Sequence, residues 1–418
     1  MADEPATVVA DRRRPHRVPR GLADPLLREL GRWLEPEAGV SSRPPEAVLA
    51  SGGRTGLALR RLITAHGLAP FLVRDPAAAA VVATLPDDIQ AWLAVQDERN
   101  RLRIERLLQE LGGALRALAA SGLPVMPLKG AILATRPGFD SFRRPMADLD
   151  LLVRPADRDP ARATLASLGY ERRPLRTRRP THDTFELPGN EVVVSADGEH
   201  PDNPRRIELH TEVRRHLWGW IEEDDLTAHL WAGASEATIL GEPAILPAPA
   251  ALAAHVAIHA TSDLLISRGR LIQWLDLAEV TGGAPAVGEP VGAEPVGAEP
   301  PVDLARAPHP RLVYPALRLA ARRLAGRFPP DGPDGLAALE AMIPDRLIRW
   351  VESVPLDTRA GLQAARSAPT DEGTLAVRWA RWAPYRWRLA VAHGDAPLPV
   401  AAARHARLVV SMLRRRPA

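Results

Sequence analysis

The segment "DLDLLV" at residues 148–153 places two carboxylates two positions apart within an apolar run. Alternate side chains of a β-strand share one face, so a strand here would point Asp148 and Asp150 the same way and the leucines between them toward a core. Two like charges this close need a cation or hydrogen-bond donors nearby. Oxygen ligands in this arrangement suit Mg²⁺, and the alternative is an ordinary solvated strand face.

The segment "PLKGAILA" at residues 127–134 contains Lys129, the only lysine in the chain. A strand, then Lys-Gly, then a short helix would present free backbone N–H groups near Gly130, an environment that favours a phosphate. The absent side chain of Gly130 would allow close approach. Lys129 would add a compact charge that the larger arginine fork cannot supply, and the alternative is a lysine retained by chance.

The segment "FRRPMADLD" adds two cations, Arg143 and Arg144, just before the paired acids. A guanidinium can bind phosphate oxygens through two N–H groups, and we expect Arg144 to make a second phosphate contact. The alternative for each arginine is a surface charge.

A third acid lies in "RRIELHTEV" at residues 205–213, which alternates in the manner of a strand. Glu208 and His210 would share one face, and Ile207 and Leu209 the other. If this strand pairs beside residues 148–153, Glu208 completes a three-carboxylate cluster typical of a two-metal phosphoryl-transfer centre, with His210 as an accessory candidate. The alternation permits this pairing but does not require it.

The motifs L-K-G, R-P-M-A-D-L-D-L-L-V and I-E-L-H together resemble the uncharacterised nucleotidyltransferase family of bacteria, part of the DNA polymerase beta-like nucleotidyltransferase superfamily. The segments "HVAIHA", "LIQWLDLAEV" and "LVYPALRLAARRLAG" resemble the later motifs of that family, and the resemblance spans roughly residues 100–330. The third motif more usually carries Asp, whereas this chain has the longer Glu208. The first 100 residues carry no recognised motif, and the segment 282–302 replaces ordinary helical sequence.

The resemblance implies an α+β fold, with a small mixed β-sheet nucleotidyltransferase core flanked by extensive helical regions. It also implies a magnesium-dependent enzyme that moves a nucleoside monophosphate from a nucleoside triphosphate, with ATP as the default donor, to an unidentified hydroxyl-type acceptor. Two Mg²⁺ ions would bind Asp148, Asp150 and Glu208, and Glu208 would also orient or deprotonate the acceptor. Lys129, Gly130 and Arg144 would hold the triphosphate. The acceptor class stays open among a small molecule, a peptide, a protein and an RNA end.

The elements that must position these residues divide the chain into six predicted regions. Residues 122–247 form the predicted core, and the clearest helix lies between Pro86 and Gly122, where apolar residues recur every three or four positions. The other regions are a disordered tail, an N-terminal helical region, a helical region packing on the core, a Pro/Gly-rich linker or insertion, and a C-terminal helical region, at 1–20, 21–121, 248–281, 282–302 and 303–418.

The composition excludes several classes of protein. The chain of 418 residues has no cysteine, so disulfides, thiolate zinc sites and cysteine nucleophiles are ruled out. No apolar run reaches the roughly 18 residues of a membrane span, and the start lacks the apolar core of a signal peptide. We therefore predict a soluble, cytoplasmic protein. The formal net charge of +3 is weak support for a nucleic-acid partner.

Three alternative readings stay open at this stage. The first is a non-catalytic accessory or antitoxin-like protein that retains the fold. The second is RNA or DNA binding through the arginine-rich ends, "DRRRPHRVPR" and "LRRRPA", for which solvated tails are the simpler explanation. The third concerns His255 and His259, which would share a helix face. We expect them to be packed histidines more readily than ligands in the active site. Asp276 is interpreted as a structural hydrogen-bonding residue.

Overall fold

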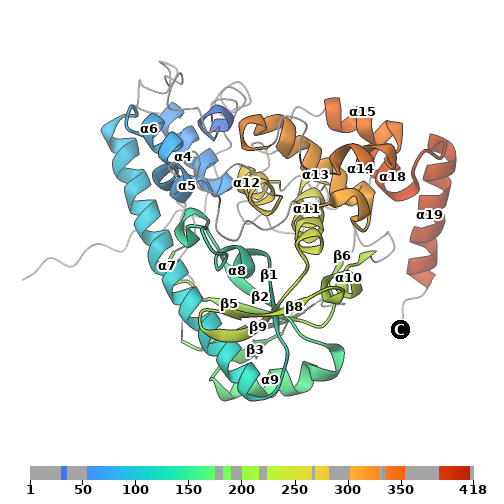
Figure 1. The fold of residues 1–418 in the computed structure, drawn as a ribbon. Helices are drawn as coiled ribbons and strands as arrows, with labels where there is room; N and C mark the ends of the chain where they lie inside the picture. Colours follow the sequence, from blue (N-terminus) through green and yellow to red (C-terminus); the bar gives the residue numbers. More distant parts are fainter. Residues whose placement is uncertain are drawn as a thin grey trace, which may run out of the picture.

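The computed structural model describes residues 30–34, 54–174, 182–189, 200–215, 224–265, 269–281, 302–328, 333, 335–353 and 386–414. Helices surround one five-stranded mixed sheet in this part of the chain (Figure 1), which confirms the predicted α+β class. The predicted tail 1–20 and the predicted linker 282–302 lie outside the described residues, apart from Val302. None of the described helices is both long and apolar enough to cross a membrane.

The N-terminal part is helical, as predicted. It contains α4 (Arg54–His66), α5 (Ala69–Arg74), α6 (Pro76–Val82) and the 34-residue α7 (Asp87–Ala120). Helix α7 begins directly after Pro86, with two acids in its first turn where the helix dipole favours negative charge. It ends before Gly122, which has a φ of +70°. The predicted helix between Pro86 and Gly122 is therefore confirmed.

The sheet has the strand order β1-β2-β5-β4-β3. Strands β2 and β5 are parallel, and the other neighbours are antiparallel. Strand β1 lies at one edge, which its Pro127 tolerates because an edge strand can lack one N–H donor. The 205–213 segment pairs beside the 148–153 segment, a pairing that the sequence permitted but did not require. The strand bounds are Met126–Leu128, Asp148–Leu152, Glu171–Arg173, His182–Glu186 and Arg206–His210 for β1 to β5.

One face of the sheet is apolar and is covered by α7 and by α9 (Arg158–Ser167). Leu149 and Leu151 of β2 and Ile207 and Leu209 of β5 lie in this core with almost no exposure. They alternate with the acids of the same strands, so the opposite face carries the polar side chains. Short helix α8 (Lys129–Leu133) follows β1 directly and packs on β2.

A second core lies on the other side of the sheet and unites the N-terminal helices with α11 (Pro249–Leu265), α12 (Leu271–Val280) and α13 (Pro310–Arg323). Figure 1 shows these later helices, in yellow and orange, above the sheet. The polar face of the sheet therefore faces this layer of helices. The remaining helices are α10 (Thr227–Trp231), α14 (Leu336–Ala341), α15 (Asp345–Ser353), α18 (Arg386–His393) and α19 (Leu398–Arg414), and short 3-10 turns lie at Ser141–Arg143, Pro155–Asp157, Leu304–Arg306 and Ala325–Arg327.

Two small hairpins accompany the main sheet. One pairs β6 (Arg214–Arg215) with β7 (Asp224–Asp225), and the other pairs β8 (Ser235–Ile239) with β9 (Glu242–Leu246). The second was not predicted from the sequence. Its turn places Leu240 and Gly241 at positive φ, +54° and +83°. Such turns usually carry Asn or Asp before Gly, so the Leu-Gly pair gave no hairpin signal.

The last residue of α4, His66, joins this helix to α12. Its buried ring accepts the N–H of Leu271 through Nδ1 at 3.1 Å. Burial, with the positive charge of Arg270, lowers the pKa of His66 to about 3. The imidazole is therefore neutral in the folded protein well below neutral pH.

We expect this histidine to make the fold acid-sensitive. Because the folded pKa lies below the unfolded value, the unfolded chain binds the extra proton first, and stability is lost as pH falls below about 6.5. Between pH 7 and pH 5 the contribution of His66 to the free energy of unfolding should fall by about 2 kcal/mol. Urea unfolding at several pH values would measure it, with His66→Gln as the control that lacks this term. Parallel pH profiles for the two proteins would contradict the prediction.

Candidate active site

The register of β2 and β5 brings the three predicted acids onto one face of the sheet. Asp150 lies directly opposite Glu208 across the parallel pair, and Asp148 lies one alternation earlier on β2. The side chain of Asp150 is only 3% exposed, whereas that of Glu208 is 18% exposed. A solvated strand face therefore does not describe these acids. They form a cluster at the boundary between the sheet and the helices above it.

Lys129 lies at the start of α8 and reaches this cluster. Its Nζ donates to Asp150 Oδ1 at 2.5 Å. Its backbone has a φ of +48°, in the left-handed region that residues other than glycine rarely adopt. Such strained residues are concentrated at functional sites. The single lysine of the chain is thus held against the most buried acid of the cluster.

His210 makes the second contact to the same oxygen, with Nε2 lying 2.9 Å from Asp150 Oδ1. Burial alone would raise the pKa of Asp150, but the charge of Lys129 and the His210 hydrogen bond outweigh burial and hold that pKa well below its usual range. Burial would likewise lower the pKa of His210, but its bond to Asp150 raises it. Asp150 is therefore the acid that stays ionised.

Asp148 behaves in the opposite way. Burial, together with the negative charges of Asp150 and Glu208, raises the pKa of Asp148 to about 6, against the opposing charges of Lys129 and Arg144. The cluster thus carries more negative charge than the surrounding cations neutralise. Three carboxylates with this surplus fit a hard divalent cation such as Mg²⁺, because such ions take oxygen ligands.

Arg144 lies beside the cluster but is already paired. Its Nε donates to Asp276 of α12 at 2.8 and 3.0 Å, and both side chains are mostly buried. Asp276 is therefore a hydrogen-bonding residue, as predicted. Gly130 is buried, and a Cβ on it would lie 2.6 Å from Arg144 and 2.9 Å from Met146. The close approach that Gly130 permits in this structure is to these two side chains.

A further cation, Arg270, precedes α12. This residue is exposed and lies within electrostatic reach of Asp148, Asp263 and Asp276. Its backbone N–H donates to Gln273, and Gln273 in turn donates to Asp263 at 2.8 Å. The start of α12 therefore places a cation within electrostatic reach of the acid cluster.

A pocket adjoins the Arg144–Asp276 ion pair. Arg143 and Arg327 bring positive charge to it, and both are bonded to Asp75 and lie over the ring of Phe71 at 4.8 and 4.9 Å. Its lining residues are Phe71, Phe139, Arg143, Arg144, Ile272, Leu275, Asp276, Ala278, Glu279 and Arg327. The pocket lies between α5, α12 and the 3-10 turn at Ala325–Arg327, and it shares Arg144 with the candidate site.

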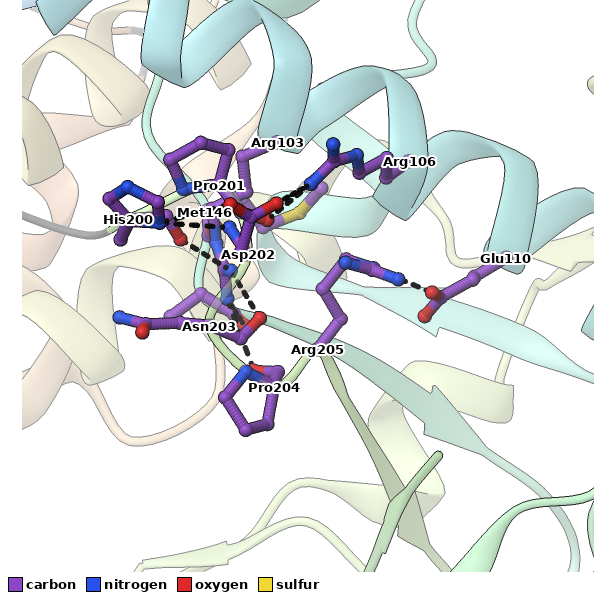
Figure 2. A network of polar contacts seen from close by, with 11 residues as sticks. Arg103, Arg106, Glu110, Met146, His200, Pro201, Asp202, Asn203, Pro204 and Arg205 are labelled. Carbon is purple, nitrogen blue, oxygen red and sulfur yellow. Dashed lines mark hydrogen bonds and ion pairs between the residues drawn. The ribbon is translucent and has the colours of Figure 1, made fainter. Parts of the chain in front are cut away.

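One buried arginine holds the two acid-bearing strands together. Arg103 of α7 is 1% exposed, and its guanidinium donates to the carbonyls of Met146 and Ala147, just before β2. The same group donates to Asn203, at 3.0 Å, just before β5. Figure 2 shows this arginine among the segments that lead into both strands. Arg103 therefore fixes the relative positions of Asp148, Asp150 and Glu208 without touching them.

A family model described as uncharacterised nucleotidyltransferase matches residues 57–285, more than half of the chain. The chain belongs to the uncharacterised nucleotidyltransferase family. The match begins earlier than the resemblance estimated from the motifs, so it includes α5, α6 and most of α4, and it ends before the helices that follow residue 302. No curated protein and no solved structure matches the chain.

Membership in the uncharacterised nucleotidyltransferase family gives the cluster a context. The family supports a role in nucleotidyl transfer and a nucleotide substrate. In the structure, Lys129 and His210 both contact Asp150, which lies beside Asp148 and opposite Glu208. Their individual roles stay predictions.

His255 is buried on α11, and His259 lies 3.8 Å from Asp263.

Several residues of this site were not identified from the sequence. His182 and Thr184 lie on β4, opposite His210 and Glu208. The strand itself was predicted, but a lone histidine or threonine in a strand carries no local signal. Arg103 and Arg270 were not singled out, since only tertiary contacts distinguish them from the many other arginines.

Proposed function

We propose that the protein is a magnesium-dependent nucleotidyltransferase that moves a nucleoside monophosphate from a nucleoside triphosphate, with ATP as the default donor, to a hydroxyl-type acceptor. The observation that carries the proposal is the register of β2 and β5, which sets Asp150 opposite Glu208 and beside Asp148. The raised pKa of Asp148 supports it, because the cluster needs further positive charge.

Asp148, Asp150 and Glu208 would hold the metal, and two ions are expected. When bound, Mg²⁺ neutralises the negative charge that develops on the attacking and leaving oxygens. The acceptor oxygen attacks the α-phosphorus, the bond from that phosphorus to the bridging oxygen breaks, and pyrophosphate leaves. Glu208, a partly exposed carboxylate, orients the acceptor hydroxyl and takes its proton.

Lys129 and Gly130 would bind the triphosphate together with an arginine. Lys129 is held at the edge of the acid cluster and its side chain is 21% exposed. Its ammonium group can therefore leave Asp150 and bind a phosphate oxygen. Arg144 has its Nε committed to Asp276, which orients its guanidinium toward the same region. Arg270 is the more accessible cation, and we add it to the triphosphate-binding set.

Calorimetric titration with ATP, GTP, CTP and UTP, with and without Mg²⁺, tests the proposal. We expect magnesium-dependent binding that is lost in the Asp148→Asn/Asp150→Asn variant. Lys129→Met should weaken binding by about 10- to 100-fold, the worth of one charge-assisted contact to a phosphate. Arg116→Met is the matched control, because this arginine is 71% exposed and pairs with Glu242. Binding of no nucleotide by the unaltered protein would favour the non-catalytic accessory reading.

A further inference from the structure

Beside the three acids, a second group of side chains has the composition of a metal site. His182, Glu208 and His210 each offer one donor atom, and these atoms all lie within 4.8 Å of one another. His182 on β4 is the direct register partner of His210 on β5, and their rings are 5.0 Å apart. Both histidines therefore stand on the same face of the sheet as Glu208.

The distances between the donor atoms of this group are similar to those between atoms that bind the same metal ion. Glu208 Oε1 lies 3.4 Å from His182 Nε2, and Glu208 Oε2 lies 3.7 Å from His210 Nε2. Both distances exceed the usual hydrogen-bond length. Ligand atoms around a tetrahedral zinc ion lie roughly 3.3 Å apart, given metal–ligand distances of about 2.0–2.1 Å. Small side-chain rotations would bring all three donors onto one ion.

Thr184 provides an independent observation. It lies on β4 as the register partner of Glu208, so its side chain is on the same face of the sheet as Glu208. It is 6% exposed, and its buried Oγ1 has no hydrogen-bond partner among the residues that the structure describes. A buried hydroxyl without a partner is costly unless a ligand of the site satisfies it. Its position fits a hydroxyl that bonds to a water or an oxygen held at the group.

The ligand types decide which ion fits. Mg²⁺ takes oxygen ligands almost exclusively, whereas imidazole suits Zn²⁺, Co²⁺ and other transition metals. Asp150 Oδ1 lies 2.9 Å from His210 Nε2, so an ion on that nitrogen also comes within reach of a fourth ligand. His210 would exchange its hydrogen bond with Asp150 for the metal.

We propose that His182, Glu208 and His210 bind one divalent transition-metal ion at the junction of β4 and β5, next to the Asp148–Asp150 pair. Glu208 would be a ligand at both metal positions. The carboxylate position would then bind Mg²⁺, and the histidine position would bind a transition-metal ion. The inference concerns metal binding by the protein alone and stands apart from nucleotide transfer.

Titration of the metal-free full-length protein with Co²⁺ and with Mn²⁺, in the absence of nucleotide, tests this site. We expect a visible Co²⁺ absorption band and, by pulsed electron paramagnetic resonance, coupling of bound Mn²⁺ to imidazole nitrogen. His182→Gln should remove one nitrogen ligand and weaken Co²⁺ binding by about 100-fold. His229→Gln, which alters an exposed histidine on α10, is the matched control and should bind as the unaltered protein does.

Absence of the visible Co²⁺ absorption band in the unaltered protein would overturn the proposal, and this result does not depend on any variant folding. Equal Co²⁺ affinity in His182→Gln would overturn it as well. Nitrogen coupling in a protein that binds no nucleotide would support this metal site and contradict the proposed transferase function. Loss of Co²⁺ binding in His182→Gln with retained magnesium-dependent nucleotide binding would support both.

Discussion

Replacing Asp150 by Asn is expected to lower nucleotidyl transfer by about a thousand-fold or more while leaving the protein folded. Asp150 is the acid that stays ionised, because Lys129 and His210 both bond to its Oδ1. Loss of that charge removes a metal ligand and about 4 kcal/mol of transition-state stabilisation. The fold should tolerate the change, since the variant also relieves the repulsion between Asp150 and Asp148.

The measurement is incorporation of label from α-labelled ATP into a mixed set of hydroxyl acceptors, alongside thermal unfolding of each protein. Asp159→Asn is a suitable control, because that acid is 85% exposed on α9 and lies outside the cluster. An Asp150→Asn protein with full transfer activity would rule out the assigned site. Loss of activity with a lowered melting temperature would instead place the effect in the fold.

The second large effect is expected from Arg103→Met. This change keeps the bulk of the side chain but leaves the carbonyls of Met146, Ala147 and Asn203 without their charged donor. Buried carbonyls that lose a charged donor are costly, so the free energy of unfolding should fall by about 3–5 kcal/mol. Transfer activity should fall as well, because the segments entering β2 and β5 lose their common anchor.

Urea unfolding measures this effect, and the same helix offers a matched control. Arg106 lies one turn later and pairs with Asp202, but the two side chains are 39% and 60% exposed. Arg106→Met should therefore change the free energy of unfolding by less than about 1 kcal/mol. Similar stability losses for the two variants would show that Arg103 has no special positioning role.

Local patterns in the sequence predicted the faces of the strands well. The alternation in "DLDLLV" and "RRIELHTEV" separated acids from core residues, and the structure buries Leu149, Leu151, Ile207 and Leu209 together. This succeeds because a strand exposes its side chains with a period of two, whatever its partner is.

Partners distant in sequence could not be predicted in the same way. Arg144 was expected to face a phosphate, but it pairs with Asp276, 132 positions later. Lys129 bonds to Asp150, 21 positions later, and His182 reaches Glu208 only through strand pairing. Each of these contacts depends on tertiary packing, which a local pattern does not encode. The roles assigned to the site residues likewise stay predictions.

The strand order has a consequence for how the protein is made. Strand β5 is the last of the five to leave the ribosome, yet it occupies the middle of the sheet between β2 and β4. Until β5 inserts, the facing edges of β2 and β4 are unpaired and open to strands of other molecules. Nascent chains that end before Arg206 thus lack Glu208 and His210 and expose two unpaired strand edges. Insertion of β5 therefore completes the acid cluster and protects these edges from aggregation in one folding step.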